Sequence, residues 1–346
     1  MTSANSASRS LTRRQVLRIF ALGGLALGLG LDEVRQQPAG ARLVRVHETR
    51  LLMGTLATLT LLTDQPAAGR TAIDAAFTRM QRLEGLLSRF IPSSQIAVLN
   101  RTGALASAAP DVQRVLRKAL DYSEATQGAF DVTIEPVLDI YREAARRGQS
   151  PDPSTLEQRR TLVNFRAIQQ RGDGIRLKRS GMAVTFDGLA KGYVLDAGAD
   201  ELLRHGLADV LVEAGGDLSA RGMTANGGWR IGVQAPRTPA GELLGTTQVE
   251  NAALATSGDY IQRFGHGYEQ HHILNPVTAS SPRALSSVTV LAATACDADA
   301  LSTALMVLGA EYGGALINEM PGVRALLVGK DARTHTIGGF AYTGHV

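Results

Sequence analysis

A lysine set between two glycines is the first feature of this sequence that suggests chemistry. Lys191 lies in the segment FDGLAKGYVLD (186–196), at the expected start of a helix, with Gly188 and Gly192 close by. Glycines let a ligand come close to the backbone, and a lysine near a helix N-terminus can neutralise a phosphate group. The order Gly-Lys-Ser/Thr of a P-loop is absent, so other segments must supply the remaining parts of any phosphate site.

Asp299 and Thr303 form a second candidate, because they stand four residues apart on an expected helix. Side chains at i and i+4 share a helix face, so their oxygens could bind one ion together. One carboxylate and one hydroxyl are a reasonable partial shell for magnesium (Mg2+), which keeps waters and accepts phosphate oxygens as further ligands. The alternative is helix capping, with Asp297 or Asp299 capping the first turn and Thr303 bonding back to a carbonyl. On these residues alone both interpretations stay open.

A histidine supplies the third candidate. His272 in HHILNPVT precedes the turn signal Asn275-Pro276. A histidine fixed beside a rigid turn can act as a general base near neutral pH. The neighbouring His271 could have this role instead, and either ring could be a structural hydrogen-bonding group.

Phe130 and Asp131 follow the end of an expected helix in GAFDVTIEP (128–136). An aromatic ring beside a carboxylate could flank a flavin or could simply close the core. Neither interpretation is excluded by composition.

The elements that must position these residues alternate irregularly between helix and strand. Apolar residues at helical spacing predict helices over about 67–88, 110–128, 190–205 and 297–309, the last one closed by Gly309. Extended patterns predict strands on both sides of Met53-Gly54 and at 208–214, 229–234, 286–293, 325–331 and 335–343. The stretch REAARRGQSPDPST (142–155) is typical of a surface connection. This order favours a mixed α+β fold over a strict βαβ repeat.

Charge placement argues against a nucleic-acid partner. The formal net charge is +4, but residues 1–41 hold five arginines and two acidic residues, or +3, which leaves +1 for the remainder. The basic character therefore belongs mostly to the first residues.

Those first residues predict a Tat-type signal peptide over 1–41. The pair Arg13-Arg14 precedes 13 uncharged apolar residues, Ile19 to Leu31, which are too few for a bilayer span of about 20 residues. Ala39-Gly40-Ala41 is a plausible cleavage site, so we expect a periplasmic protein, or one anchored in the inner membrane if the leader is retained. The single cysteine, Cys296, excludes an internal disulfide.

Eight motifs occur in an order that resembles the ApbE family of FAD:protein FMN transferases, also called flavin transferases. The resemblance spans about residues 44–340. The motifs are MGT (53–55), LLSRFIPSSQIAVLN (86–100), GAFDVTIEP (128–136), FDGLAKGYVLD (186–196), VEAGGDL (212–218), ATSGDY (255–260), HILNPVT (272–278) and DADALSTALMVLG (297–309).

The resemblance implies a fold and a reaction. It implies one flavin transferase domain over 42–346, a T-fold-related α+β body of largely antiparallel sheets packed with helices, with the site between two lobes. It implies Mg2+-dependent transfer of the FMN moiety of FAD to a threonine hydroxyl of a target protein, with release of AMP. The acceptor would be exported or membrane-bound, as a subunit of a respiratory electron-transport complex is.

The resemblance also assigns roles to single residues. It implies that His272 is the base and that Lys191 faces the FAD diphosphate. It implies that Gly188, through its backbone carbonyl, joins Asp299 and Thr303 as metal ligands. Further positions that it implies as FAD contacts are Met53, Phe90, Ala129, Phe130, Asp131, Thr185 and Leu274.

Several residues depart from the family pattern. Thr185 stands where the family often has Asp, and Asp187 follows two residues later, which puts the polar contact from this loop in doubt. Asn275 replaces the usual Asp, Ala279 the usual Gly and Glu213 the usual Asn. None of these positions is the expected base or a side-chain metal ligand.

Two other functions fit the same residues. In a Mg2+-dependent FAD pyrophosphatase, water would attack in place of threonine and yield FMN and AMP. A non-catalytic periplasmic FAD carrier would bind the flavin without turnover.

Overall fold

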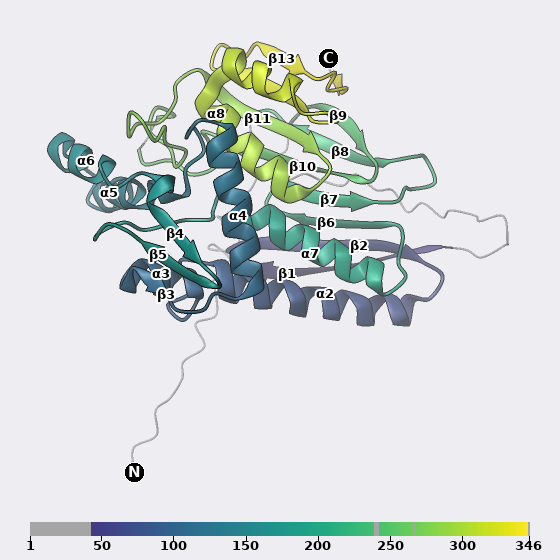
Figure 1. The fold of residues 1–346 in the computed structure, drawn as a ribbon. Coiled ribbons are helices and arrows are strands. Elements are labelled where there is room, and N and C mark those ends of the chain that lie inside the picture. Colours follow the sequence, from purple (N-terminus) through teal and green to yellow (C-terminus); the bar gives the residue numbers. More distant parts are fainter. Residues whose placement is uncertain (1–42, 239–241, 266, 345–346) are drawn as a thin grey trace.

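The computed structural model describes residues 43–238, 242–265 and 267–344 (Figure 1). The expected signal peptide lies outside the described residues. The largest element is an eight-stranded sheet in the order β1-β2-β6-β7-β10-β11-β12-β13. Every pairing between neighbouring strands of the described sheets is antiparallel. Its strands are β1 (Val44–Leu52), β2 (Thr55–Thr63), β6 (Val210–Ala214), β7 (Asp217–Arg221), β10 (Ala252–Gly258), β11 (Leu285–Ala292), β12 (Arg324–Gly329) and β13 (Thr334–Ile337).

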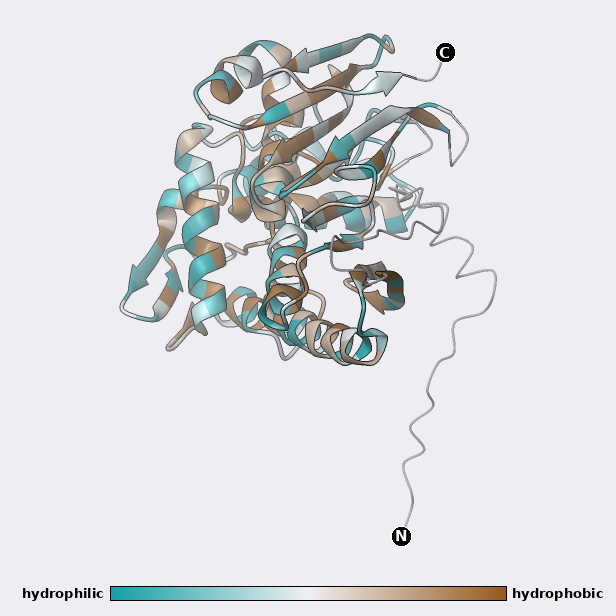
Figure 2. Cartoon of the chain, turned by 90° about the vertical axis from the view of Figure 1, so that its right-hand side faces the viewer, coloured by the Kyte–Doolittle hydropathy of each residue, from teal (hydrophilic) through white to brown (hydrophobic). Residues whose placement is uncertain are grey.

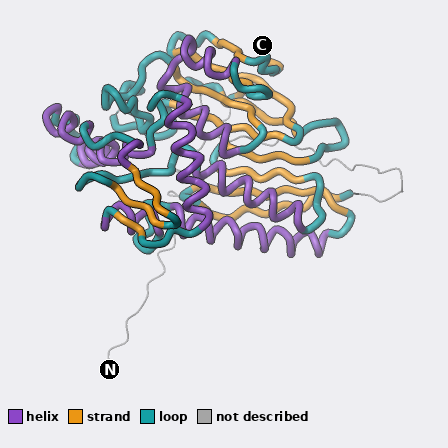
Figure 3. Tube along the Cα trace, in the orientation of Figure 1, coloured by secondary structure: helices purple, strands orange, loops and turns teal. Residues whose placement is uncertain are grey.

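The two faces of this sheet are covered differently. Long helices lie as one layer in front of the strands in Figure 3. They are α2 (Pro66–Leu87), α4 (Pro110–Ala125), α7 (Ala190–Arg204) and α8 (Ala295–Asn318). The opposite face packs on a second sheet, β14-β9-β8, through a separate apolar cluster around Trp229 and Leu218. The strands of that sheet are β8 (Trp229–Gln234), β9 (Leu243–Val249) and β14 (Thr343–Gly344).

The helices are amphipathic, as burial on one face requires. In α2 the buried residues include Ile73, Phe77, Met80 and Leu83, which recur at helical spacing. Brown and teal segments both occur along the long helices in Figure 2, so these helices contain apolar as well as polar residues. Helix α8 is long and apolar enough to pass for a membrane span by length and composition. Half of it, 12 of 24 residues, is buried, which is typical of a core helix.

A smaller lobe lies beside the main sheet, at the left of Figure 1. It contains the sheet β3-β5-β4 and the helices around it, and it shares one apolar core cluster with α2 and α7. Its elements are α3 (Gln95–Thr102), β3 (Ala104–Leu105), the 3-10 turn η1 (Val132–Ile134), α5 (Glu135–Arg146), α6 (Pro153–Arg160), the 3-10 turn η2 (Phe165–Ala167), β4 (Ile168–Arg171) and β5 (Gly174–Leu177).

The predicted α+β class is confirmed, with two corrections in the details. The stretch 142–155 is mostly helical, because α5 continues to Arg146 and α6 begins at Pro153. Gly309 does not close its helix: it forms a kink with φ 74° and ψ −174°, after which the chain returns to helix as far as Asn318. Glycine tolerates this positive φ, so one turn is interrupted without ending the element.

Candidate active site

One cavity of about 140 Å3 lies between the small lobe and the main sheet. Segments far apart in sequence form its wall: the turn before α5, the start of α7, the end of β10, the loop after it, and the first turns of α8. Ten of the twelve expected site residues line it, namely Ala129, Phe130, Asp131, Thr185, Gly188, Lys191, His272, Leu274, Asp299 and Thr303.

Two expected flavin contacts, Met53 and Phe90, do not line this cavity. Met53 lies in the turn between β1 and β2 with φ 52°, and its N–H donates to Glu84 Oε1 at 2.9 Å. Phe90 is 67% exposed, and the Arg89 guanidinium stacks over its ring at 3.8 Å. Since Arg89 itself lines the cavity, Phe90 lies just outside the cavity wall.

Lys191 makes a buried ion pair. Its Nζ lies 2.8 Å from Asp217 Oδ2, and Asp217 also accepts from the Thr256 N–H at 3.1 Å. Burial alone would lower the pKa of Lys191, but Asp217 and then Asp299 outweigh it and raise that pKa. The lysine is therefore a fixed cation on the cavity wall. The motif VEAGGDL (212–218) contains Asp217, but the sequence does not indicate that this carboxylate pairs with Lys191.

Asp299 is held by α7 and does not cap its own helix. Its Oδ2 accepts from the Gly192 N–H at 3.1 Å. The cap of α8 is Thr294, whose side chain accepts from the Asp297 N–H. Burial raises the pKa of Asp299 to about 8, the Asp217 charge adding to this effect and Lys191 opposing it. The carboxylate is thus turned toward the cavity with little to compensate its charge.

Thr303 lies one helical turn further on, against Gly188. A Cβ built on Gly188 would lie 3.3 Å from Thr303 Oγ1 and 3.0 Å from the ring of Phe130. The Thr303 hydroxyl is 3.3 Å from Ser257 Oγ, which in turn bonds Ser302 Oγ at 2.8 Å. The structure therefore places the three expected metal ligands in one corner, with Ser257 as a hydroxyl neighbour that sequence reading missed.

The donor set in this corner fits a hard divalent cation. Two buried carboxyl groups, Asp217 and Asp299, face a single lysine, so deprotonation of Asp299 leaves one negative charge that a bound cation would compensate. Carboxylate, hydroxyl and carbonyl oxygens are ligands that Mg2+ accepts. No group of three or more His, Cys, Asp and Glu suited to a metal occurs among the described residues.

The structure separates the two histidines. His271 is 0% exposed and does not line the cavity. Its Nε2 contacts the Pro282 carbonyl at 3.2 Å, and its buried Nδ1 has no partner among the described residues. His272 lines the cavity, and its Nδ1 lies 3.2 Å from the Gln262 carbonyl. That contact assigns the proton to Nδ1 and leaves Nε2 as the free lone pair.

Phe130, Asp131 and Thr185 shape the wall as well as lining it. Asp131 starts the turn before α5 by accepting from the Thr133 N–H at 2.8 Å and the Phe165 N–H at 3.1 Å. Phe130 is 4% exposed and belongs to the core cluster. The Thr185 hydroxyl accepts from the Asp187 N–H at 3.1 Å, so it sets the turn that leads to Gly188.

A charged cluster on the small-lobe side of the cavity was not expected from sequence. Arg89 bridges two segments, with Nε 2.8 Å from Asp187 Oδ2 and Nη1 3.2 Å from Glu135 Oε1. Arg142 Nη2 donates to the same Glu135 oxygen at 2.5 Å. Burial raises the pKa of Glu135 to about 7, although both arginines oppose this shift. The Asp187 carboxylate is therefore bound to Arg89. It is thus not a free substitute for the Asp that the family often has at the position of Thr185.

An α+β body that brings a fixed cation, a free imidazole and a carboxylate–hydroxyl pair into one hollow is typical of enzymes that act on phosphorylated ligands. Comparison with known proteins agrees with this class: the ApbE family model matches residues 53–327, and the chain belongs to that family. The predictions of family and of transferase class are thereby confirmed.

The relatives agree in sequence and in fold. An FAD:protein FMN transferase of Treponema pallidum is 30% identical over 86% of this chain and 88% of its own length. The structure of the flavin transferase ApbE from Vibrio cholerae matches with a TM-score of 0.74 and 25% identity, over 86% of this chain and 98% of that one. An ApbE protein from Thermotoga maritima, at 24% identity over 85% of this chain and 97% of that one, shares the fold with a TM-score of 0.77.

Proposed function

We propose that this chain is a Mg2+-dependent FAD:protein FMN transferase that attaches FMN to a threonine hydroxyl of an exported or membrane-bound target and releases AMP. The observation that carries the proposal is the meeting of His272 with Lys191, Asp299 and Thr303 in one cavity. The names of the curated relatives support flavin transfer to protein.

In the proposed reaction, His272 is the general base. Its Nε2 has no hydrogen-bond partner among the residues that the structure describes, while Nδ1 is engaged by the Gln262 carbonyl. Burial, with His271 adding, lowers the pKa of His272 to about 4, so the ring is neutral and ready to accept a proton at neutral pH.

The bond changes balance as a phosphoryl transfer. The threonine oxygen attacks the phosphorus on the FMN side of the FAD diphosphate while its proton passes to His272 Nε2. The new P–O bond is the phosphoester. The bond between that phosphorus and the bridging oxygen of the anhydride breaks, and AMP leaves with the bridging oxygen and its negative charge. Lys191, fixed by Asp217, neutralises charge on the diphosphate oxygens.

Gly188, Asp299 and Thr303 would hold Mg2+, which when bound supplies positive charge to the phosphate oxygens. The chain's own part is to keep these oxygens oriented. The Gly192 N–H holds the Asp299 carboxylate, and Ser257 holds the Thr303 hydroxyl.

We further propose export by the Tat route to the periplasm, with a respiratory electron-transport subunit as acceptor. Paired arginines before a short apolar run support the route. Fusion of residues 1–41 to a folded reporter would test it, because replacing Arg13-Arg14 by lysines should stop export.

The transfer is tested by intact mass of exported proteins incubated with this protein, FAD and Mg2+. An acceptor should gain the mass of FMN, and His272→Ala or Asp299→Ala should abolish the gain while the fold persists. Asp200→Ala, on the exposed side of α7, and His205→Ala, at the exposed residue directly after α7, are matched controls that should retain it. Free FMN and AMP without a modified protein would indicate a pyrophosphatase, and no AMP at all would indicate a carrier.

A further inference from the structure

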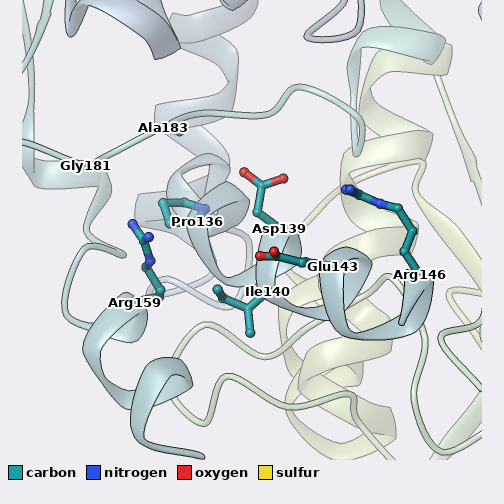
Figure 4. Close-up of a pocket in the computed structure, with 8 residues that line it drawn as sticks. All are labelled: Pro136, Asp139, Ile140, Glu143, Arg146, Arg159, Gly181 and Ala183. Carbon is teal, nitrogen blue, oxygen red and sulfur yellow. The ribbon is translucent and has the colours of Figure 1, made fainter. Parts of the chain in front are cut away.

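A second hollow lies on the outer side of α5, next to the cavity. This groove has a volume of about 310 Å3 and is formed by α5, by Arg159 of α6, and by the backbone at Gly181 and Ala183. Figure 4 shows Arg146 and Arg159 at its opposite ends, with the carboxylates of Asp139 and Glu143 between them.

The groove is lined by two arginines and two acidic residues, and only the acidic residues have an ion-pair partner among the described residues. Asp139 is paired with Arg142 at 2.6 Å, and Glu143 is paired with Arg147. Arg146 and Arg159 have no ion pair within the described part of the chain, and both are exposed. Each of the two acids therefore has an arginine partner, although Arg142 is shared with Glu135, while two guanidinium groups remain available to an anionic partner.

One segment without helix or strand, residues 181–188, connects the groove with the cavity. Gly181 and Ala183 line the groove, whereas Thr185, Asp187 and Gly188 line the cavity. The two hollows also adjoin at one ion pair, because Arg142 lines the cavity and its partner Asp139 lines the groove. A polypeptide that lies in the groove therefore has a short path to the reacting groups.

This segment has an open backbone position. Val184 is fully paired, its N–H at 2.7 Å and its C=O at 2.8 Å from the Asn100 side chain. The Thr185 N–H donates to the Val132 carbonyl at 2.8 Å. The N–H and C=O of Ala183 have no partner among the residues described, and Ala183 is half-buried in the groove. An extended chain with free backbone groups can accept an added strand.

We propose that the groove docks the acceptor: an extended, acidic segment of the target protein pairs with the backbone at Ala183, and Arg146 and Arg159 bind its carboxylates. Its threonine then reaches the cavity beside Asp187. This inference rests on the proposed transfer to a threonine hydroxyl. Residues 181–188 cover roughly 25 Å if extended at about 3.3 Å per residue, so a peptide of about 12 residues is long enough.

The test compares two synthetic peptides of about 12 residues with a single threonine, one flanked by aspartates and one by lysines at the same positions. The acidic peptide should accept FMN about tenfold more efficiently, the effect of two surface ion pairs. The preference should vanish or invert in R146E/R159E. It should persist in the control R70E/R82E, which reverses two exposed arginines of α2.

Ala183→Pro tests the backbone contact independently. It removes the N–H and should lower transfer to the acidic peptide about fivefold, with FAD binding and melting temperature unchanged, whereas Ala183→Ser should transfer normally. Equal use of both peptides, or an unchanged preference in R146E/R159E, would overturn the docking site while exported proteins are still flavinylated. Loss of transfer to every protein by the wild type would refute the proposed function and this inference together.

Discussion

Gly192 of α7 lies directly against the first turn of α8, and a side chain added at this position should displace Asp299. A Cβ at position 192 would lie 2.1 Å from the Ala295 carbonyl oxygen and 2.3 Å from its carbon. Ordinary contacts are about 3.4 Å or longer, so the overlap is more than 1 Å. The atoms in the way are backbone atoms of the first turn of α8, so no side-chain rotation relieves it and the helices must separate.

The magnitude follows from three terms. Overpacking costs about 3 kcal/mol, which is the upper end of the usual range of about 1–3 kcal/mol, because backbone atoms must move. Weakening the Gly192 N–H bond to the Asp299 carboxylate adds about 1–2 kcal/mol. The better helix propensity of alanine returns about 1 kcal/mol. The net destabilisation of Gly192→Ala is therefore about 3–4 kcal/mol, or roughly 5–6 °C in melting temperature for a domain of about 300 residues.

Thermal unfolding followed by circular dichroism checks this value, with Gly85→Ala as the matched control. Gly85 lies in α2 with nothing within 4 Å of a built Cβ, so alanine there should stabilise by up to about 1 kcal/mol. The stabilisation of the protein by Mg2+ should also be lost in Gly192→Ala, because Asp299 moves. A Gly192→Ala protein that melts at or above the wild-type temperature would refute the tight α7–α8 contact and the positioning of Asp299.

Two further predictions concern pH. Burial lowers the pKa of His272 to about 4, so the imidazole is neutral above that pH. At saturating Mg2+, kcat/KM for transfer should therefore fall only when the pH drops to about 4. A fall in kcat/KM near pH 6.5, about the usual pKa of histidine, would contradict the assignment of His272 as the base. Burial raises the pKa of Asp299 to about 8, so Mg2+ must displace a proton below that pH. Calorimetric Mg2+ affinity should then rise about tenfold per unit up to pH 8 and level off, whereas Asp299→Asn should bind weakly without this slope.

Local signals were enough to predict the elements that carry the site. Pro66 and Pro110 lie at the first turns of α2 and α4, where a missing N–H costs nothing. The hairpin turn at Met53-Gly54 has positive φ at both residues, a conformation that glycine adopts readily. Gly309 was misjudged for a tertiary reason: packing of the C-terminal half of α8 on its core cluster favours a return to helix after the kink.

Ion pairs between segments far apart in the chain could not be predicted from such local signals. The Asp217 partner of Lys191 and the Arg89 bridge between Glu135 and Asp187 join residues far apart in sequence. No periodicity encodes which of several nearby carboxylates meets a given cation. Motif order named ten residues that line one cavity and two expected flavin contacts, Met53 and Phe90, that do not line it, since motif order carries no information on how far each loop extends.

The choice between capping and metal binding at the start of α8 depends on which side chains accept from the N–H groups of its first turn. Asp196 of α7 accepts from the N–H groups of Ala295 and Cys296 at 2.9 Å each, and Thr294 accepts from that of Asp297 at 3.1 Å. Burial opposes ionisation of Asp297, but Lys118, Thr294 and Tyr122 hold its pKa below the usual value. With the helix start satisfied and its neighbour paired, Asp299 is the one carboxylate of this turn that keeps an elevated pKa and faces the cavity. The capping interpretation of the sequence was wrong for both Asp297 and Asp299, because Thr294 and Asp196 accept from the N–H groups of this turn. The availability of the Asp299 side chain for a cation follows because other residues cap the helix.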